Sequence, residues 1–218
     1  MNKTKIKICG LKSEKDIEMV NRYRPDFCGF IIDFPKSHRS LEPERVSELS
    51  RLIDREHMTA VGVFVNESIE QVAELLNDGT IDVAQLHGNE TADYIAQLRS
   101  LTDKKLIKAF AVKDKASLNA AAACTADYIL LDQGQGSGET FDWSILGSRD
   151  AEEAFGSGGL PKKEWFLAGG LGEHNIEQAI QRFKPFAVDL SSAVETDRCK
   201  DETKVKKIIE LVRNCRMA

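Results

Sequence analysis

The chain has 218 residues, of which 42% are hydrophobic and 30% are charged, and its formal net charge is -5. This composition excludes a disordered or collagen-like chain, and the mild acidity argues against a nucleic-acid-binding surface. No apolar run is long enough to cross a bilayer, so we expect no membrane partner.

The N-terminal residues lead directly into a strand-like segment rather than into the apolar core of a signal peptide. The five cysteines are odd in number and show no Cys-x-x-Cys spacing. We therefore expect free thiols and a cytoplasmic protein, with neither a disulfide framework nor a metal site.

Short apolar runs alternate with amphipathic segments from one end of the chain to the other, which is typical of parallel strands joined by helices. Helix start signals follow several strands, among them Ser13, Pro43 and Ser68. The predicted strands are, in chain order, 5–9, 27–32, 59–65, 83–86, 106–112, 128–131, 165–168 and 187–190.

Eight such units of about 27 residues each predict an α/β fold, a single (β/α)8 TIM barrel that takes in residues 1–218. A doubly wound open sheet would fit the same alternation. It is less favoured because no Gly-x-Gly-x-x-Gly follows the first strand. One segment, 147–163, is polar and glycine-rich, and we interpret it as a surface excursion between the sixth helix and the seventh strand.

The loops after the seventh and eighth strands predict a phosphate site. The first carries Gly169 and Gly170, and the second carries Ser191 and Ser192. Glycines let backbone N–H groups approach an anion, and serine hydroxyls add donors. Because barrels bind phosphate at these two loops, the pair favours an anion site over two ordinary turns.

The first strand ends at Cys9 and the sixth ends at Asp132, so a thiol and a carboxyl group are expected at the carboxyl-terminal mouth of the barrel. An unperturbed thiol with a pKa of about 8.5 is only about 3% ionised at pH 7. As a base, Cys9 therefore needs a nearby cation or helix N-terminus, whereas Asp132 would have to hold a proton to act as an acid.

Three further loops supply candidate ligand-binding residues. Arg39 could clamp a carboxylate or be a solvated loop residue, and the two readings are even. His87 ends the fourth strand and is either a ligand contact or a local hydrogen-bond partner. Gly136 and Gly138 belong to a glycine-rich loop after Asp132 that could fold over a ligand.

These segments together resemble the phosphoribosylanthranilate isomerase family. The resemblance runs from Lys5 to the last helix and rests on seven motifs in order: Ile8–Leu11, Ser37–Arg39, Val61–Asn66, Gln85–Gly88, Gly136–Trp143, Leu167–Leu171 and Asp189–Glu195. It implies an isomerase of tryptophan biosynthesis that rearranges N-(5'-phosphoribosyl)anthranilate to 1-(2-carboxyphenylamino)-1-deoxyribulose 5-phosphate without metal or organic cofactor. By the family's roles, Asp132 would protonate the ring oxygen and Cys9 would take the C2 proton.

The chain departs from the family pattern at Ala193 and Arg198, which replace common glycines, and at His38, which stands where proline is frequent. Ala193 would have to avoid a positive φ. Two alternatives stay open, another sugar-phosphate isomerase or epimerase barrel and a non-catalytic barrel that binds a sugar phosphate. In each case we expect a monomer.

Overall fold

The computed structural model describes residues 3–132 and 143–215. Eight parallel strands form a closed barrel, because β1 pairs with both β2 and β9. The barrel strands are β1 (Lys5–Cys9), β2 (Phe27–Ile32), β4 (Thr59–Phe64), β5 (Val83–Leu86), β6 (Lys105–Ala111), β7 (Tyr128–Asp132), β8 (Trp165–Leu167) and β9 (Ala187–Leu190). The predicted (β/α)8 fold is confirmed, and every predicted strand overlaps an observed one to within one residue at each end.

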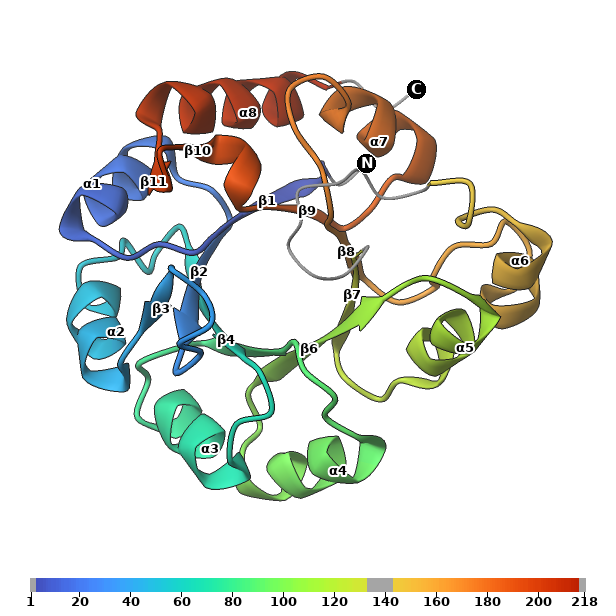
Figure 1. Ribbon diagram of the computed structural model, residues 1–218, viewed down its shortest axis with the longest axis horizontal. Coiled ribbons are helices and arrows are strands. Elements are labelled where there is room, and N and C mark those ends of the chain that lie inside the picture. The colour runs from blue at the N-terminus through green and yellow to red at the C-terminus, as the bar shows by residue number, and fades with distance from the viewer. Residues whose placement is uncertain (1–2, 133–142, 216–218) are drawn as a thin grey trace.

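The helices of the described residues form an outer ring around the strands (Figure 1). They are α1 (Glu14–Tyr23), α2 (Pro43–Ser50), α3 (Ile69–Asn77), α4 (Ala92–Leu101), α5 (Lys115–Ala123), α6 (Arg149–Phe155), α7 (Ile176–Phe183) and α8 (Glu202–Asn214). The start signals act as expected: the Ser13 and Ser68 side chains accept from the N–H of Asp16 and Gln71, and Pro43 is the first residue of α2.

The interpretation of 147–163 as a surface excursion was wrong in one respect, because this segment contains α6. Ser148 caps the helix by accepting from the N–H of Ala151, and Gly156 ends it at φ +93°. Only Ala151 and Phe155 of the helix are buried. Its sequence is otherwise polar, so the apolar periodicity that reveals the other helices is weak here.

Four short elements were not predicted. β3 (Ser40–Leu41) adds a parallel strand beside β2, and the 3-10 turn η1 (Ser192–Val194) follows β9. β10 (Glu195–Thr196) and β11 (Cys199–Lys200) then form a small antiparallel hairpin before α8. Three of the four lie between β9 and α8, so the loop after the last barrel strand is itself a structured unit.

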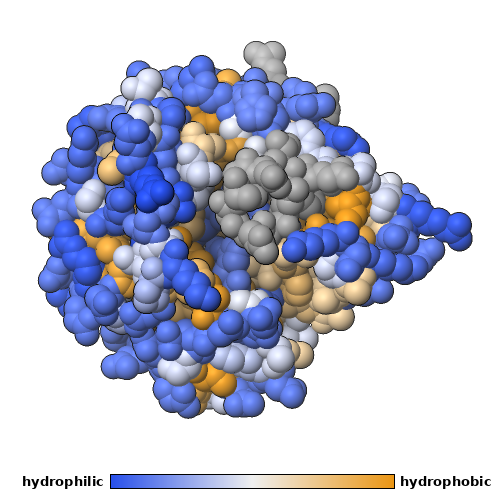
Figure 2. All heavy atoms as spheres, in the orientation of Figure 1, coloured by the Kyte–Doolittle hydropathy of each residue, from blue (hydrophilic) through white to orange (hydrophobic). Residues whose placement is uncertain are grey.

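The core has two shells. One lies between the sheet and the helices, and the other fills the barrel from inside. The inner shell contains packed aromatic rings. The ring centroids of Phe27 and Phe166 are 5.2 Å apart, and those of the stacked Tyr128 and Phe186 rings are 5.4 Å apart. In the orientation of Figure 1, the outer helix faces are largely hydrophilic and hydrophobic groups gather between neighbouring helices (Figure 2). No described helix is long and apolar enough to span a membrane.

Candidate active site

A cavity of about 1240 Å³ opens at the carboxyl-terminal ends of the barrel strands. Of the ten predicted site residues, eight line this cavity: Cys9, Arg39, His87, Asp132, Gly169, Gly170, Ser191 and Ser192. The other two, Gly136 and Gly138, lie outside the described residues. The loops that the sequence picked out separately therefore share one space.

Cys9 lies at the end of β1, only 6% exposed, above a buried ion pair. Lys7, two residues earlier on the same strand and fully buried, donates from Nζ to both carboxylate oxygens of Asp189 at 3.0 Å. Residues two apart on a strand share a face, so Lys7 and Cys9 both face the barrel interior. Burial alone would lower the pKa of Lys7, but Asp189 and Cys9 raise it above its ordinary value, so Lys7 keeps its charge.

The expected cation beside Cys9 is therefore present, but its effect on the pKa of the thiol is smaller than the effect of burial. Burial raises the pKa of the Cys9 thiol above its ordinary value, and the charge and hydrogen bonding of Lys7 act in the opposite direction. In the unliganded protein at neutral pH, Cys9 is accordingly a thiol. A ligand that brings additional positive charge would favour the thiolate.

Two glycines leave space for the side chains of Cys9 and Arg39. A Cβ atom on Gly29, which is paired with Cys9 across β1 and β2, would lie 2.9 Å from the Cys9 sulfur. Gly10 has φ +83°, and a Cβ there would lie 2.4 Å from Cδ of Arg39. Any side chain at either position would push into the site, so both glycines shape it.

Asp132 ends β7 and faces the imidazole of His87, with 3.7 Å between Oδ2 of Asp132 and Nε2 of His87. The other ring nitrogen, Nδ1, lies 2.8 Å from the amide Nε2 of Gln85. Burial lowers the pKa of His87, and the opposing charge of Asp132 does not reverse this, so the ring is neutral at physiological pH. His87 thus lines the cavity and also has a local hydrogen-bond partner, and its contact with a ligand stays a prediction.

A second buried ion pair holds the loop that carries His87. Lys108 donates to Oε2 of Glu90 at 2.9 Å and to the carbonyl oxygen of Gly88 at 2.8 Å. The Glu90 carboxylate also accepts from the backbone N–H groups of Gly88 and Asn66. These charge-assisted bonds fix the backbone just after β5, and with it the position of the imidazole.

Arg39 is part of a charged cluster. Its Nε and Nη2 donate to Oε1 and Oε2 of Glu195, each at 2.7 Å, and Lys200 donates to Oε1 of the same carboxylate at 2.7 Å. Burial alone would raise the pKa of Glu195, but Arg39 and Lys200 lower it to about 2. The two nitrogens expected to clamp a ligand carboxylate are therefore engaged within the protein, and Nη1 makes no hydrogen bond to a described residue.

The two loops of the predicted anion site adjoin each other. Gly169 and Gly170 have φ of +87° and +63°, which a glycine adopts without strain. A Cβ on Gly172 would lie 3.7 Å from that of Ala193, in the loop after β9. Ala193 is not among the described residues with positive φ, so the requirement placed on it by the sequence is met. The hydroxyl of Ser191 is used internally, because it donates to the carbonyl oxygen of Cys9 at 3.0 Å.

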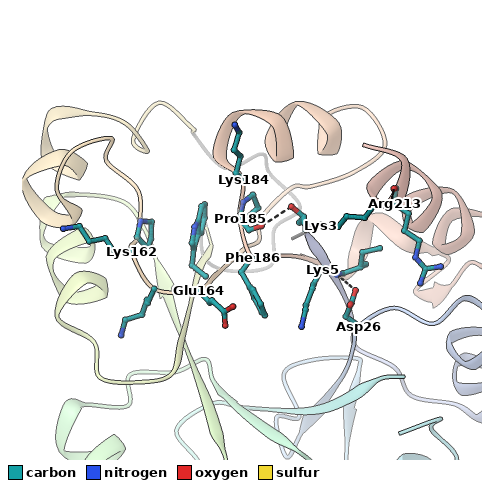
Figure 3. Close-up of a pocket in the computed structure, with 14 residues that line it drawn as sticks. Lys3, Lys5, Asp26, Lys162, Glu164, Lys184, Pro185, Phe186 and Arg213 are labelled. Atoms are coloured by element: carbon teal, nitrogen blue, oxygen red, sulfur yellow. Dashed lines mark hydrogen bonds between the residues drawn. The ribbon is translucent and has the colours of Figure 1, made fainter. Parts of the chain in front are cut away.

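A second hollow, of about 660 Å³, lies at the opposite end of the barrel, where β1, β8 and β9 begin. Figure 3 shows that its labelled cations diverge: Lys3 runs toward Arg213, whereas Lys162 and Lys184 point outward. Lys5 instead lies 4.8 Å from the centroid of the Phe186 ring. Divergent cations do not form an anion site, and this end of a barrel carries stability rather than chemistry.

One group of described side chains could hold a metal ion, namely Asp54, Glu56 and His57, whose ligand atoms lie within 4.8 Å of one another. The group is largely exposed and precedes β4, at the end of the barrel away from the cavity. It therefore has no part in the chemistry of the cavity.

Sequence reasoning missed four charged or polar residues of the site: Lys7, Gln85, Asp189 and Lys200. Lys7 and Gln85 each stand two residues before a predicted site residue on a strand, so their placement on the same face could have identified them. Asp189 becomes recognisable only when the barrel closes, since it meets Lys7 of β1, whereas Lys200 meets Glu195 across the small hairpin of β10 and β11. Together these groups surround a thiol and a carboxyl group, an arrangement that can add and remove protons on a bound ligand.

A family model described as N-(5'-phosphoribosyl)anthranilate (PRA) isomerase matches residues 6–211. Two curated proteins with that enzyme name, from Thermoanaerobacter pseudethanolicus and Endomicrobium trichonymphae, are each 39% identical to the chain. The matches cover 97% and 96% of this chain and 99% and 98% of the respective relatives.

Solved structures are similar over the same extent. A phosphoribosylanthranilate isomerase from Thermus thermophilus superposes with a TM-score of 0.81 at 27% identity and covers 98% of this chain and 100% of its own. Another, solved with reduced 1-(o-carboxyphenylamino)-1-deoxyribulose 5-phosphate, has a TM-score of 0.77 at 29% identity and covers 96% and 98%. The similarity therefore extends over almost the entire length of each chain.

Proposed function

Because the chain belongs to the N-(5'-phosphoribosyl)anthranilate isomerase family, we propose that Cys9 is the base and Asp132 the acid of its reaction. The enzyme is an isomerase of tryptophan biosynthesis that acts on N-(5'-phosphoribosyl)anthranilate. One observation carries the residue assignment: a thiol and a carboxyl group, from β1 and β7, both line the cavity at the carboxyl-terminal end of the barrel.

The substrate has three parts that match three parts of the cavity. Its phosphate would bind the loops of Gly169 and Gly170 and of Ser191 and Ser192, where backbone N–H groups can approach it. Because Ser191 uses its hydroxyl on Cys9, we assign the role of that residue to its backbone. The sugar then lies between Cys9 and Asp132.

The anthranilate carboxylate would bind the Nη1 side of Arg39. Glu195 and Lys200 form the remainder of this charged cluster, so the guanidinium is oriented before the substrate arrives. An oriented guanidinium loses little entropy when it binds a carboxylate. His87 and the loop of Gly136 and Gly138 complete the predicted binding residues.

The rearrangement needs one proton added and one removed. Asp132 donates a proton to the furanose ring oxygen, the C1–oxygen bond breaks, and a protonated imine forms between C1 and the anthranilate nitrogen. The Cys9 thiolate then removes the proton at C2, and the electron pair neutralises the iminium nitrogen to give an enolamine. Tautomerisation of the enolamine, with a proton added at C1, yields the ketone product.

The buried charges beside Cys9 support this order of events. The thiol pKa is raised in the unliganded protein, and a positive iminium next to the sulfur would lower it at the step where a base is needed. Lys7 would stabilise the same thiolate from beneath. A modest base then suffices, because the iminium acidifies the adjacent C–H bond.

The test follows the loss of anthranilate fluorescence when freshly generated substrate is mixed with wild type, Cys9→Ser and Asp132→Asn. We expect rapid loss with wild type and a fall of about 10² or more in kcat for each variant, the typical contribution of a positioned acid or base. Wild-type rates in a correctly folded variant would remove that residue from the assignment.

We further infer a cytoplasmic enzyme that folds as one domain and is monomeric. All five cysteines are free, which fits a reducing compartment. The exposed large hydrophobic residues of the described chain are Leu52, in the turn after α2, and Leu101, the last residue of α4. A similar structure from Thermotoga maritima is described as monomers of a dimeric enzyme. Light scattering coupled to size exclusion distinguishes the two states, and a mass of twice 24.3 kDa would contradict a monomer.

A further inference from the structure

Gln85 lies inside the barrel directly beneath His87. It is fully buried on β5, between Val63 of β4 and Ile107 of β6, and it lines the active-site cavity. Its amide Nε2 is 2.8 Å from Nδ1 of His87. Its amide oxygen is buried and has no hydrogen-bond partner among the described residues. A fully buried amide with one unsatisfied atom is costly, so its presence needs a reason.

The amide decides where the imidazole carries its proton. With its nitrogen toward His87, the amide can only donate there, so in this orientation Nδ1 accepts and the proton of the neutral ring is on Nε2. That nitrogen faces Oδ2 of Asp132 at 3.7 Å. Reversing the amide would put the proton on Nδ1 and leave a bare lone pair toward Asp132, so the two orientations have opposite effects on the carboxyl group.

We propose that Gln85 is a positioning residue that holds His87 as its Nε2–H tautomer, so that the imidazole stabilises the Asp132 carboxylate left after proton donation to the substrate. The inference rests on the proposed role of Asp132. A neutral donor aimed at the carboxylate helps most in the transition state, when negative charge develops there. The unpartnered oxygen of Gln85 remains available to a hydroxyl group of the sugar.

The tautomer is measured directly by long-range proton–nitrogen NMR on protein labelled with 15N in its four histidines. The His87→Asn variant identifies the His87 signals, and no substrate is needed. We expect Nδ1 unprotonated and Nε2 protonated in wild type. In Gln85→Met no group donates to Nδ1, so the Nδ1–H form should become populated; an unchanged pattern in this variant would overturn the proposal.

Gln85→Met keeps the side-chain volume and removes both hydrogen-bonding atoms, which guards against a variant that fails because of a buried charge. We expect kcat to fall by about tenfold or more. This is smaller than the rate factor of roughly 10² that a positioned acid contributes, because the acid itself remains. In the Asp132→Asn background the same substitution should change kcat by less than about twofold, since the group that it acts through is gone.

Gln178→Met, on the exposed face of α7, is the matched control and should keep the wild-type rate. A folded Gln85→Met variant with wild-type kcat would overturn the proposal. Because the NMR measurement involves no turnover, the tautomer can be confirmed or refuted even if Asp132 proves not to be the acid. The two failures are therefore distinguishable.

Discussion

Arg39 and Glu195 form a two-pronged ion pair at the mouth of the barrel, with Nε–Oε1 and Nη2–Oε2 distances of 2.7 Å. The partners are 156 residues apart in the chain and join the loop after β2 to the hairpin after β9. Lys200, only 1% exposed at its side chain, donates to the same carboxylate. The Glu195 carboxylate thus binds two cations beside the cavity.

This cluster predicts a specific loss of stability in acid. The pKa of Glu195 is lowered to about 2 from an ordinary 4.5, so its contribution is fully present above about pH 4.5 and is lost as pH falls toward 2. We expect this contribution to the free energy of unfolding to be about 3 to 4 kcal/mol, because the pKa falls from 4.5 to about 2 and one pKa unit corresponds to about 1.4 kcal/mol. Urea unfolding of wild type and Glu195→Gln at pH 7, 4.5 and 3 measures it.

Glu195→Gln should be less stable than wild type at pH 7, and the difference should shrink at pH 3. The exposed Glu210→Gln on α8 is the control and should parallel wild type at all three values. A constant difference between Glu195→Gln and wild type across the pH range would contradict the linkage.

The raised pKa of Cys9 predicts slow alkylation in the free enzyme. Iodoacetamide should modify Cys9 at a rate that rises with pH beyond 9, because burial keeps the sulfur protonated below that range. Mass spectrometry of peptides resolves Cys9 from the exposed Cys199, which reports on reagent access in the same sample. Rapid modification of Cys9 at pH 7 would show instead that Lys7 dominates its environment.

The buried pair of Lys7 and Asp189 predicts that stability and activity can be separated. Lys7→Met alone leaves a nearly buried carboxylate without its cation, and we expect a loss of about 3 kcal/mol. The double variant Lys7→Met/Asp189→Leu removes both charges and should recover most of that stability.

Turnover of the same double variant should stay well below wild type, because no cation remains to stabilise the Cys9 thiolate. Urea unfolding and steady-state rates on the three proteins check both statements. Full recovery of kcat together with stability would show that the pair is only structural.

The hairpin of β10 and β11 predicts a stabilising substitution. Its two loop residues, Asp197 and Arg198, have φ of +50° and +61°, the conformation of a two-residue turn that favours glycine at its second position. Arg198→Gly should raise stability by about 0.5 to 1 kcal/mol, because it relieves a left-handed backbone. Asp197→Gly should gain less, since aspartate tolerates this region better, and differential scanning calorimetry compares the two.

Most of the barrel was predictable because most of its strands are short apolar runs that alternate along the chain with amphipathic segments. The strand end at Cys9 and the loops of Gly169 and Ser191, which the sequence singled out, line one cavity, and their roles stay predictions. The helix α6 was not predicted, since its buried face consists of Ala151 and Phe155 alone. Local periodicity cannot reveal a helix with so narrow an apolar stripe.

The charge partners of the site could not be predicted for a different reason. Lys7 meets Asp189 across 182 residues, a pairing that exists only because β1 and β9 close the barrel side by side. The sequence did not decide whether Arg39 clamps a carboxylate or is a solvated loop residue. Its partner Glu195 belongs to a hairpin that no sequence pattern indicated. Sequence patterns place side chains on strand ends, whereas the contacts between strand ends depend on closure.

The hydrogen bond from the Ser191 hydroxyl to the Cys9 carbonyl oxygen joins the loop of the proposed phosphate site directly to the strand that carries the proposed base. The spacing between the phosphate and the reacting carbon would thereby be set by two adjacent strands, β1 and β9, that this bond holds together. We therefore expect the site to select substrates by the number of carbons between the phosphate and C2. A substrate one carbon longer or shorter between its phosphate and C2 would bring the wrong atom to the sulfur, however well its aromatic ring was held.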